Sequence, residues 1–193
     1  MPYSPTSSMT GKVIAITGGA SGIGLATAHL LASRGATLSL ADVSESGLET
    51  ASTAIKATHD VEILIFSLDV RNADQVDTWI KKTIVQFGKL DGAANIAGVI
   101  PKSIGVGGVA EMEAEEWEFI IGVNLTGVMH CMRTQMRTIS DGGSIVNASS
   151  IAGLTGRPNN AAYAASKHEV IGLTKSAAKE IGTRGVRVNA FAP

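Results

Sequence analysis

Short apolar runs alternate along the chain with longer segments whose apolar residues recur at helical spacing. The apolar runs are rich in β-branched residues and predict strands at 12–17, 37–41, 61–67, 90–96, 144–148 and 186–191. The helical patterns predict helices at 23–34, 45–57, 72–87, 113–139 and 160–181. Ser44 is positioned to cap the second helix, Gly88 to end the third, and 101–109 reads as a Gly-rich loop.

Strands that alternate with helices indicate parallel pairing, because each crossover helix returns the chain to the same edge of the sheet. Right-handed crossovers then give a doubly wound α/β sheet of the Rossmann type, covered by helices on both faces. The pattern begins at about Gly11 and shows no internal boundary or repeat. We therefore expect a single Rossmann-type domain at 11–193, preceded by a flexible segment at 1–10.

Composition narrows the functional classes. The 193 residues are 45% hydrophobic with a net charge of −1, and the basic residues are scattered, which argues against a nucleic-acid partner. A single cysteine, Cys131, excludes an internal disulfide and favours a reducing compartment. The N-terminus lacks the pattern of a signal peptide, and no apolar stretch reaches the ~20 residues of a membrane helix. We expect a cytoplasmic protein without a membrane partner, and the four histidines show no metal-ligand grouping.

A Gly-rich turn, TGGASGIG at 17–24, joins the first strand to the first helix. Glycine permits positive φ and close approach of a ligand to the backbone, and a helix N-terminus offers free N–H groups to a pyrophosphate. An ordinary turn also collects glycines, so the position between strand and helix is what favours phosphate binding. The candidate contacts within it are Gly18, Ser21, Gly22, Ile23 and Gly24.

Asp42 closes the second strand, where a carboxylate can accept hydrogen bonds from the adenosine ribose hydroxyls. The same carboxylate would repel a 2′-phosphate, and the Gly-rich turn contains no Arg or Lys to bind one. NAD is therefore favoured over NADP as the cofactor. A solvated loop acid is the alternative interpretation of Asp42.

Tyr163 and Lys167 are four residues apart in a helical pattern, so both side chains lie on one helix face. A nearby ammonium stabilises a phenolate, which allows tyrosine to exchange a proton with a substrate oxygen while hydride moves at the neighbouring carbon. Ser150, after the fifth strand, could orient that oxygen, and alternation along the strand turns only one of Ser149 and Ser150 toward the site. Taken singly, the helix pair could be a surface coincidence and the serine a turn residue.

These motifs occur together in an order that resembles the short-chain dehydrogenase/reductase family. The turn at 17–24 is similar to the family's TGxxxGxG, the sequence NIAG at 95–98 is similar to NNAG with Ala94 in place of the first Asn, and Ser150 precedes Tyr163-x-x-x-Lys167 at the family's spacing. The resemblance covers nearly the whole chain from about Gly11. It implies an oxidoreductase that transfers hydride between nicotinamide and a secondary alcohol or ketone of a small molecule.

The resemblance also assigns roles to individual positions. It implies that Asp69 contacts the adenine amine and the Val70 backbone a ring nitrogen, while Ala97 and Gly98 leave room for the ribose beside Tyr163 and Lys167. Asn95 would stabilise the central sheet next to the cofactor. Asn124 would join Ser150, Tyr163 and Lys167 in the catalytic set by holding a water linked to the lysine. A homodimer through the helices at 113–139 and 160–181 is implied as well.

Family members usually continue beyond the position that corresponds to Pro193 with a substrate-covering lobe and a seventh strand. We therefore expect six strands here, with the seventh strand and the substrate lid missing. Two functions remain open at this point. The first is an NAD-dependent oxidoreductase that acts in a process such as secondary metabolism. The alternative is a truncated, catalytically weak relative that binds nucleotide or a partner subunit.

Overall fold

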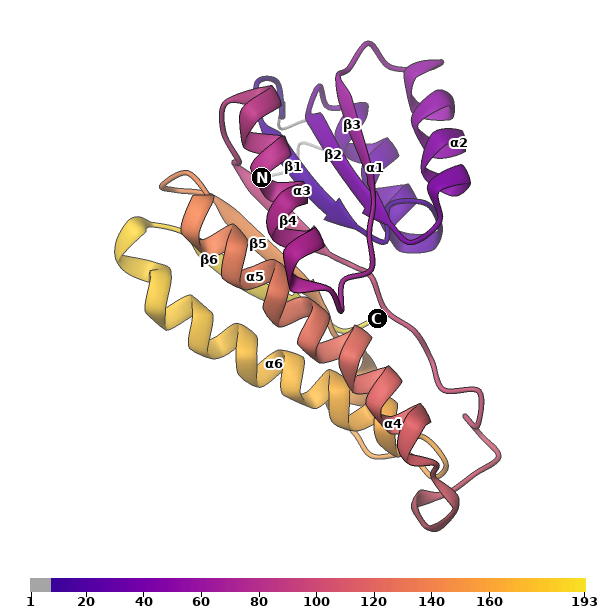
Figure 1. Ribbon diagram of the computed structural model, residues 1–193. Coiled ribbons are helices and arrows are strands. Elements are labelled where there is room, and N and C mark those ends of the chain that lie inside the picture. Colours follow the sequence, from indigo (N-terminus) through magenta and orange to yellow (C-terminus); the bar gives the residue numbers. More distant parts are fainter. Residues whose placement is uncertain (1–7) are drawn as a thin grey trace, which may run out of the picture.

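The computed structural model describes residues 8–193 and contains one parallel sheet of six strands (Figure 1). Its order is β3-β2-β1-β4-β5-β6, and every neighbouring pair is parallel. The strands are β1 (Val13–Thr17), β2 (Thr37–Asp42), β3 (Ile63–Ser67), β4 (Gly92–Asn95), β5 (Ser144–Ala148) and β6 (Arg187–Phe191). The helices are α1 (Gly22–Ala32), α2 (Glu45–Lys56), α3 (Ala73–Phe87), α4 (Ala114–Ile121), α5 (Gly127–Thr138) and α6 (Ala161–Ile181). The predicted doubly wound fold is confirmed.

Helices cover both faces of the sheet. Helices α3, α5 and α6 lie side by side over one face, and their apolar residues share a core with alternate strand positions such as Ala93 and Ile145 (Figure 1). Helices α1 and α2 pack on the opposite face against the intervening positions, among them Ile16 and Ala94. The period of two along each strand thus divides the apolar residues between two cores.

Local signals set the helix ends where the sequence predicts them. The Ser44 hydroxyl accepts a hydrogen bond from Gly47 N at 3.2 Å and caps α2. The Asn72 side chain caps α3 by accepting from the two backbone N–H groups of Asp74 and Gln75. Gly88 ends α3 with φ +78°, a left-handed conformation that favours glycine.

The predicted continuous helix at 113–139 is interrupted by one π-helical turn, Gly122–Thr126, between α4 and α5. Such turns insert an extra residue into the helical hydrogen-bond ladder and re-aim the side chains around it. The turn begins with a glycine and is followed by another, Gly127, where an added Cβ would lie 2.5 Å from Val70 Cγ2. The close approach of Val70 thus requires glycine at the start of α5.

A cavity of about 560 Å³ lies next to α1, on the sheet face that α6 does not cover. The apolar residues that line it include Ile14, Val146 and Phe191. Among residues 8–193 the outermost strand on this side is β6, in keeping with the expected six strands.

Most of the segment predicted to be flexible, 1–7, lies outside the described residues. Within its described part, Met9 N donates to Arg34 O at 2.8 Å. No helix of the described chain is sufficiently long and apolar to cross a membrane.

Candidate nucleotide-binding and catalytic site

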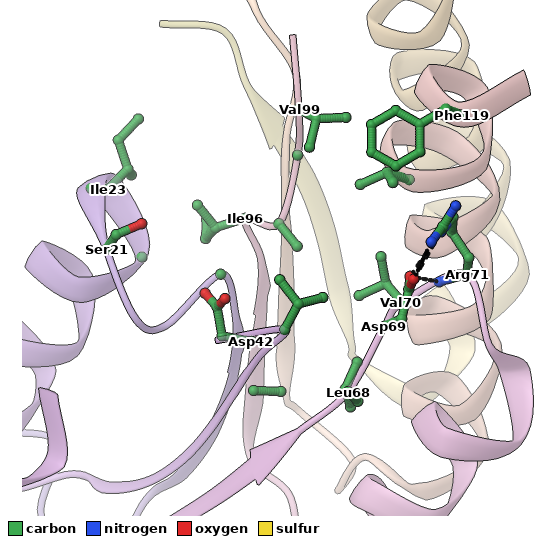
Figure 2. A pocket seen from close by; sticks show the side chains of 18 residues that line it. Ser21, Ile23, Asp42, Leu68, Asp69, Val70, Arg71, Ile96, Val99 and Phe119 are labelled. Atoms are coloured by element: carbon green, nitrogen blue, oxygen red, sulfur yellow. Dashed lines mark hydrogen bonds and ion pairs between the residues drawn. The ribbon is translucent and has the colours of Figure 1, made fainter. Parts of the chain in front are cut away.

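A cavity of about 550 Å³ opens at the carboxyl ends of β1, β2, β3 and β4 (Figure 2). This is where the sheet order reverses, since the chain moves from β1 to one side and from β4 to the other. Ligands of open parallel sheets bind in the crevice at such a point. The cavity brings together most of the residues expected to hold a cofactor: Gly18, Ser21, Gly22, Ile23, Gly24, Asp42, Asp69, Val70, Ala97 and Gly98.

The Gly-rich turn forms one wall of this cavity. Gly18 has φ +73°, and an added Cβ would stand 3.0 Å from Ala97 N. An added Cβ on Gly24 would lie 2.0 Å from Gly18 O, whereas Gly22, with φ +52°, has open space on that side. Ser21 precedes α1 without a side-chain cap, so the first-turn N–H groups are left for a ligand. The turn is a cradle that fits a pyrophosphate.

Asp42 lies at the end of β2 on the cavity floor with its carboxylate held by the backbone. Its Oδ2 accepts from Ala20 N at 3.1 Å, and its Oδ1 accepts from Ser44 N at 3.1 Å. Each oxygen keeps a further lone pair for a ligand hydroxyl. The carboxylate is therefore oriented before any ligand arrives, and it places negative charge beside the Gly-rich turn.

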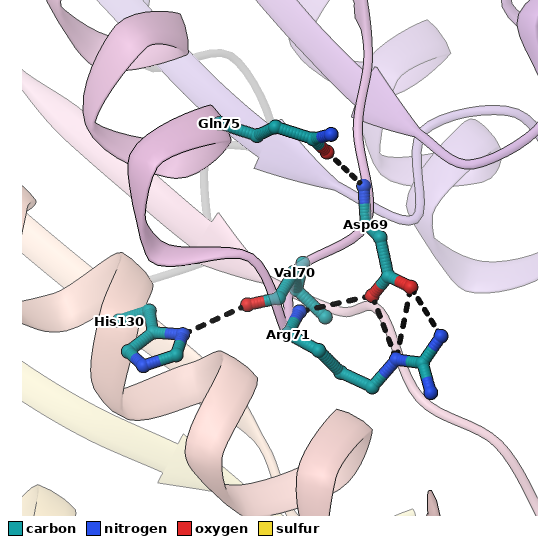
Figure 3. Close-up of polar contacts among 5 residues, drawn as sticks. All are labelled: Asp69, Val70, Arg71, Gln75 and His130. Atoms are coloured by element: carbon teal, nitrogen blue, oxygen red, sulfur yellow. Dashed lines mark hydrogen bonds and ion pairs between the residues drawn. The ribbon is translucent and has the colours of Figure 1, made fainter.

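The loop after β3 forms the opposite wall and is anchored from three sides (Figure 3). Asp69 N donates to Gln75 Oε1 at 2.9 Å, and the Val70 carbonyl lies 3.1 Å from His130 Nδ1. Arg71 binds the Asp69 carboxylate through Nε and Nη2. The hydrogen bonds from Arg71 lower the pKa of Asp69, so this carboxyl carries its negative charge over a wider pH range.

The segment after β4 places two of the expected residues on the cavity and one away from it. Ala97 and Gly98 line the cavity. Asn95 is buried, and its side chain exchanges hydrogen bonds with Gln135 at 3.0 and 2.8 Å and donates to Asn147 Oδ1 at 2.8 Å. The Asn95 amide thus ties β4 to β5 and α5 and makes no part of the cavity lining.

Lys167 and Tyr163 meet one turn apart on α6. Lys167 is 3% exposed, its Nζ donates to Ala148 O at 2.8 Å, and Nζ lies 5.6 Å from the centroid of the Tyr163 ring. Burial of the ammonium lowers the pKa of Lys167 to about 8. An added Cβ on Gly98 would stand 3.4 Å from Nζ, so the lysine lies directly behind the cavity wall at Gly98.

Ser150 and Ser149 follow β5 and turn to different partners, as the period of two predicts. Ser149 Oγ is buried and donates to Lys167 O at 2.9 Å. Ser150 Oγ accepts from Ala152 N at 3.2 Å and has a second, longer contact of 3.5 Å to Pro193 O. Among residues 8–193 no hydrogen bond joins Ser150 to Tyr163. Ser149 therefore supports the helix that carries Lys167, and Ser150 is the serine with a hydroxyl available to a substrate.

Asn124 lies within the π-helical turn, fully buried. Its Oδ1 accepts a hydrogen bond from Val99 N at 2.8 Å. Its Nδ2 donates to Val99 O at 2.8 Å and to Ser166 Oγ at 3.3 Å. Its side chain also reaches the cavity wall, because an added Cβ on Gly98 would lie 3.2 Å from Oδ1. Asn124 thus fixes the segment after β4 at Gly98 and Val99, which separates the cavity from Lys167.

Some cavity residues carry no local sequence signal. Arg71, Phe119 and Val123 line the cavity, but the last two come from α4 and the π-helical turn, whose packing is set by tertiary contacts. The one visible hint is that Arg71 follows Asp69 by two residues, a spacing at which their side chains can pair. Cys131, by contrast, is a core residue as expected: it is 1% exposed, and burial raises the pKa of its thiol to about 12.

The family model for short chain dehydrogenases matches residues 12–193. This chain belongs to that family. The short-chain dehydrogenase/reductase aba4 of Botryotinia fuckeliana is 55% identical over 184 residues, which is 95% of this chain and 71% of that protein.

Two further relatives extend the likeness to solved structures. Levodione reductase of Leifsonia aquatica is 40% identical over 98% of this chain and 71% of its own length. A crystal structure of levodione reductase gives a TM-score of 0.91 at 40% identity, over 96% of this chain and 72% of that one. The crystal structure of an NAD⁺-bound xylitol dehydrogenase gives a TM-score of 0.91 at 32% identity, over 97% of this chain and 71% of that one. As a short-chain dehydrogenase, the chain is an oxidoreductase whose family uses a nicotinamide cofactor.

Proposed function

We propose that this short-chain dehydrogenase transfers hydride between NAD and a secondary alcohol or ketone of a small molecule, with Ser150, Tyr163 and Lys167 as its catalytic residues. The observation that carries the proposal is the buried Lys167 ammonium, which lies 5.6 Å from the Tyr163 ring centroid and directly behind Gly98 of the cavity. Burying a cation at this point costs folding free energy. A buried titratable group beside a cavity is a candidate functional residue, and this supports a catalytic role for Lys167.

Each catalytic side chain has one task. A bound nicotinamide cofactor would supply the hydride chemistry. Ser150 Oγ hydrogen-bonds the substrate oxygen and orients it, and the Tyr163 hydroxyl exchanges a proton with that oxygen. The Lys167 ammonium, 5.6 Å from the centroid of the Tyr163 ring, would hold a ribose of the cofactor beside Gly98. Asn124 positions Val99 and Gly98 beside Lys167, and a water held there would link the lysine to solvent.

The remaining contacts follow the length of the cavity. The turn from Gly18 through Ser21, Gly22 and Ile23 to Gly24 would hold the pyrophosphate through backbone N–H groups. Asp42 would accept hydrogen bonds from the adenosine ribose. Asp69 would accept one from the adenine amine, and the Val70 N–H would donate one to the adenine ring. Ala97 and Gly98 would leave room for the second ribose, and Asn95 supports the segment that carries them through its hydrogen bonds to Gln135 and Asn147.

The charge beside the turn supports NAD over NADP. The Asp42 carboxylate is held in place by two backbone amides and would lie against a 2′-phosphate, which it repels. The neighbouring Val43 lines the same cavity and offers no positive charge to offset that repulsion. The NAD⁺-bound xylitol dehydrogenase structure is consistent with this choice.

The names xylitol dehydrogenase, levodione reductase and 2,5-dichloro-2,5-cyclohexadiene-1,4-diol dehydrogenase support a small molecule with a secondary alcohol or ketone as the kind of substrate. As part of the same proposal, we place this activity in the cytoplasm and in secondary metabolism. Nothing in the comparisons favours the alternative of a catalytically weak nucleotide-binding relative. Residues 11–193 form the single domain that carries this activity. The direct test is turnover with NAD and with NADP over a panel of small secondary alcohols and ketones. Turnover with NAD supports the proposal, and equal or better turnover with NADP would contradict the cofactor assignment.

We also propose a homodimer through α5 and α6. A groove of about 300 Å³ runs between these helices and is lined by the apolar side chains of Met129, Met132, Met136 and Leu173. Light scattering should give the mass of two chains. Replacing Leu173 with Arg places a charge in the groove and should give the mass of one chain, whereas an unchanged dimer in this variant would exclude the α5–α6 face as the interface.

A further inference from the structure

Arg71 holds the Asp69 carboxylate with three separate donors (Figure 3). The Arg71 backbone N–H donates to Oδ1 at 2.9 Å. Its Nε lies 3.1 Å from Oδ1 and 2.9 Å from Oδ2, and Nη2 donates to Oδ2. The orientation of the carboxylate at this end of the cavity is therefore set by a single neighbouring residue.

Arg71 is held in turn by helix α4 and the π-helical turn. Its guanidinium carbon lies 5.1 Å from the centroid of the Phe119 ring, a cation–π contact. Its aliphatic stem passes over Gly122, where an added Cβ would stand 3.3 Å from Arg71 Cδ. Arg71 and Phe119 both line the cavity on the side of Asp69 (Figure 2). The guanidinium is thus fixed between the carboxylate and the aromatic ring.

The number of hydrogen bonds leaves room for one ligand donor. A carboxylate accepts hydrogen bonds from about four donors. Arg71 supplies three donors, of which Nε is shared between Oδ1 and Oδ2, so capacity for one further donor remains. We propose that Arg71 is a positioning residue for the adenine end of the cofactor: it turns Asp69 so that the remaining acceptor site faces the adenine amine. This inference rests on the proposed function, in which Asp69 receives that amine.

We expect the ion pair between Arg71 and Asp69 to contribute little to folding stability. The Arg71 and Asp69 side chains are 47% and 32% exposed, and ion pairs this accessible to water contribute little to stability. Loss of the guanidinium should therefore change ligand binding much more than folding. A measurement that compares two ligands separates these two roles.

The test measures dissociation constants for NAD and for the NAD analogue in which unsubstituted purine replaces adenine. Only the amine differs, so their ratio reports the contact with Asp69. The chain should bind NAD about tenfold more tightly than the analogue. Arg71→Met keeps an apolar stem over Gly122 and should bring the ratio close to one, while Tm changes by less than about 4 °C. Arg71→Lys, which keeps the charge without the planar fork, should give an intermediate ratio.

Two control variants distinguish the possible failures. Lys89→Met removes an exposed cation that pairs with Asp91 away from this cavity and should leave the ratio at its original value. Asp69→Ala tests the proposed function itself, because it removes the acceptor. If Asp69→Ala lowers the ratio and both Arg71 variants leave it unchanged, the role of Arg71 is overturned and the adenine contact stands. If the unmodified chain binds both ligands equally, the adenine contact itself is wrong, and the role of Arg71 falls with it.

Discussion

Lys167 provides a quantitative prediction, because the structure buries an ammonium that the site is proposed to need. Lys167 is 3% exposed, and burial lowers its pKa from 10.5 to about 8. A lysine whose pKa is lower in the folded state destabilises the fold fully at pH values below the folded pKa. That cost disappears as the pH rises from about 8 to about 10.5, where the unfolded chain also loses the proton. The pKa difference corresponds to about 3 kcal/mol at pH 7.

Lys167→Met removes this charge at nearly constant length. At pH 7 the free energy of unfolding of the variant should rise by about 3 kcal/mol, because no charge has to be desolvated. It should fall by roughly 1–3 kcal/mol, because the hydrogen bond to Ala148 O is lost. The stability of the variant should therefore be close to that of the unmodified chain. The clearer signal is the pH dependence. Between pH 7 and pH 9.5 the unmodified chain should gain about 2 kcal/mol relative to the variant.

Urea denaturation at the two pH values measures this difference, since groups that titrate equally in both proteins cancel. Lys175→Met, an exposed position on the same helix, is the matched control and should show no such pH-dependent difference. A stability difference between Lys167→Met and the unmodified chain that stays constant from pH 7 to pH 9.5 would refute the assignment of a desolvated ammonium.

Two other variants test the support of the sheet and the choice of cofactor. Asn95→Leu leaves the amide partners on Gln135 and Asn147 without their hydrogen bonds and should cost roughly 1–3 kcal/mol for each group, measured by urea denaturation; a change below about 0.5 kcal/mol would contradict the buried network. Asp42→Ala combined with Val43→Arg should shift the ratio of NAD to NADP affinity at least about tenfold toward NADP, measured by titration with each cofactor. Tighter binding of NADP by the unmodified chain would show that the argument from Asp42 is wrong.

Local sequence signals predicted the order of the elements and placed their bounds within two residues, apart from the interruption of the helix at 113–139. The period of two in strands such as β5, the cap at Ser44 and the glycine at Gly88 each depend on a few neighbouring residues, and the structure confirms all three. The contrast between Ser149 and Ser150 also follows from strand alternation. The pairing of Tyr163 with Lys167 needs only helical spacing.

The features that the sequence did not reveal depend on contacts between distant segments. The π-helical turn at Gly122–Thr126 forms where the chain packs against Val70 and Arg71, and a helical pattern read along the sequence cannot show this. The hydrogen bonds of Asn124 to Val99 and of Asn95 to Gln135 likewise join residues 25 and 40 positions apart. The cavity wall made by Phe119 arises in the same way.

The proposed role of Tyr163 is proton transfer in a cofactor site built by the rest of the chain. Its most direct test is Tyr163→Phe, assayed for turnover of a secondary alcohol with NAD and, separately, for NAD affinity by titration. Loss of the hydroxyl should lower turnover by about 10²–10⁴-fold and change the dissociation constant for NAD by less than about threefold. Turnover within about tenfold of the unmodified chain at equal NAD affinity would contradict the account.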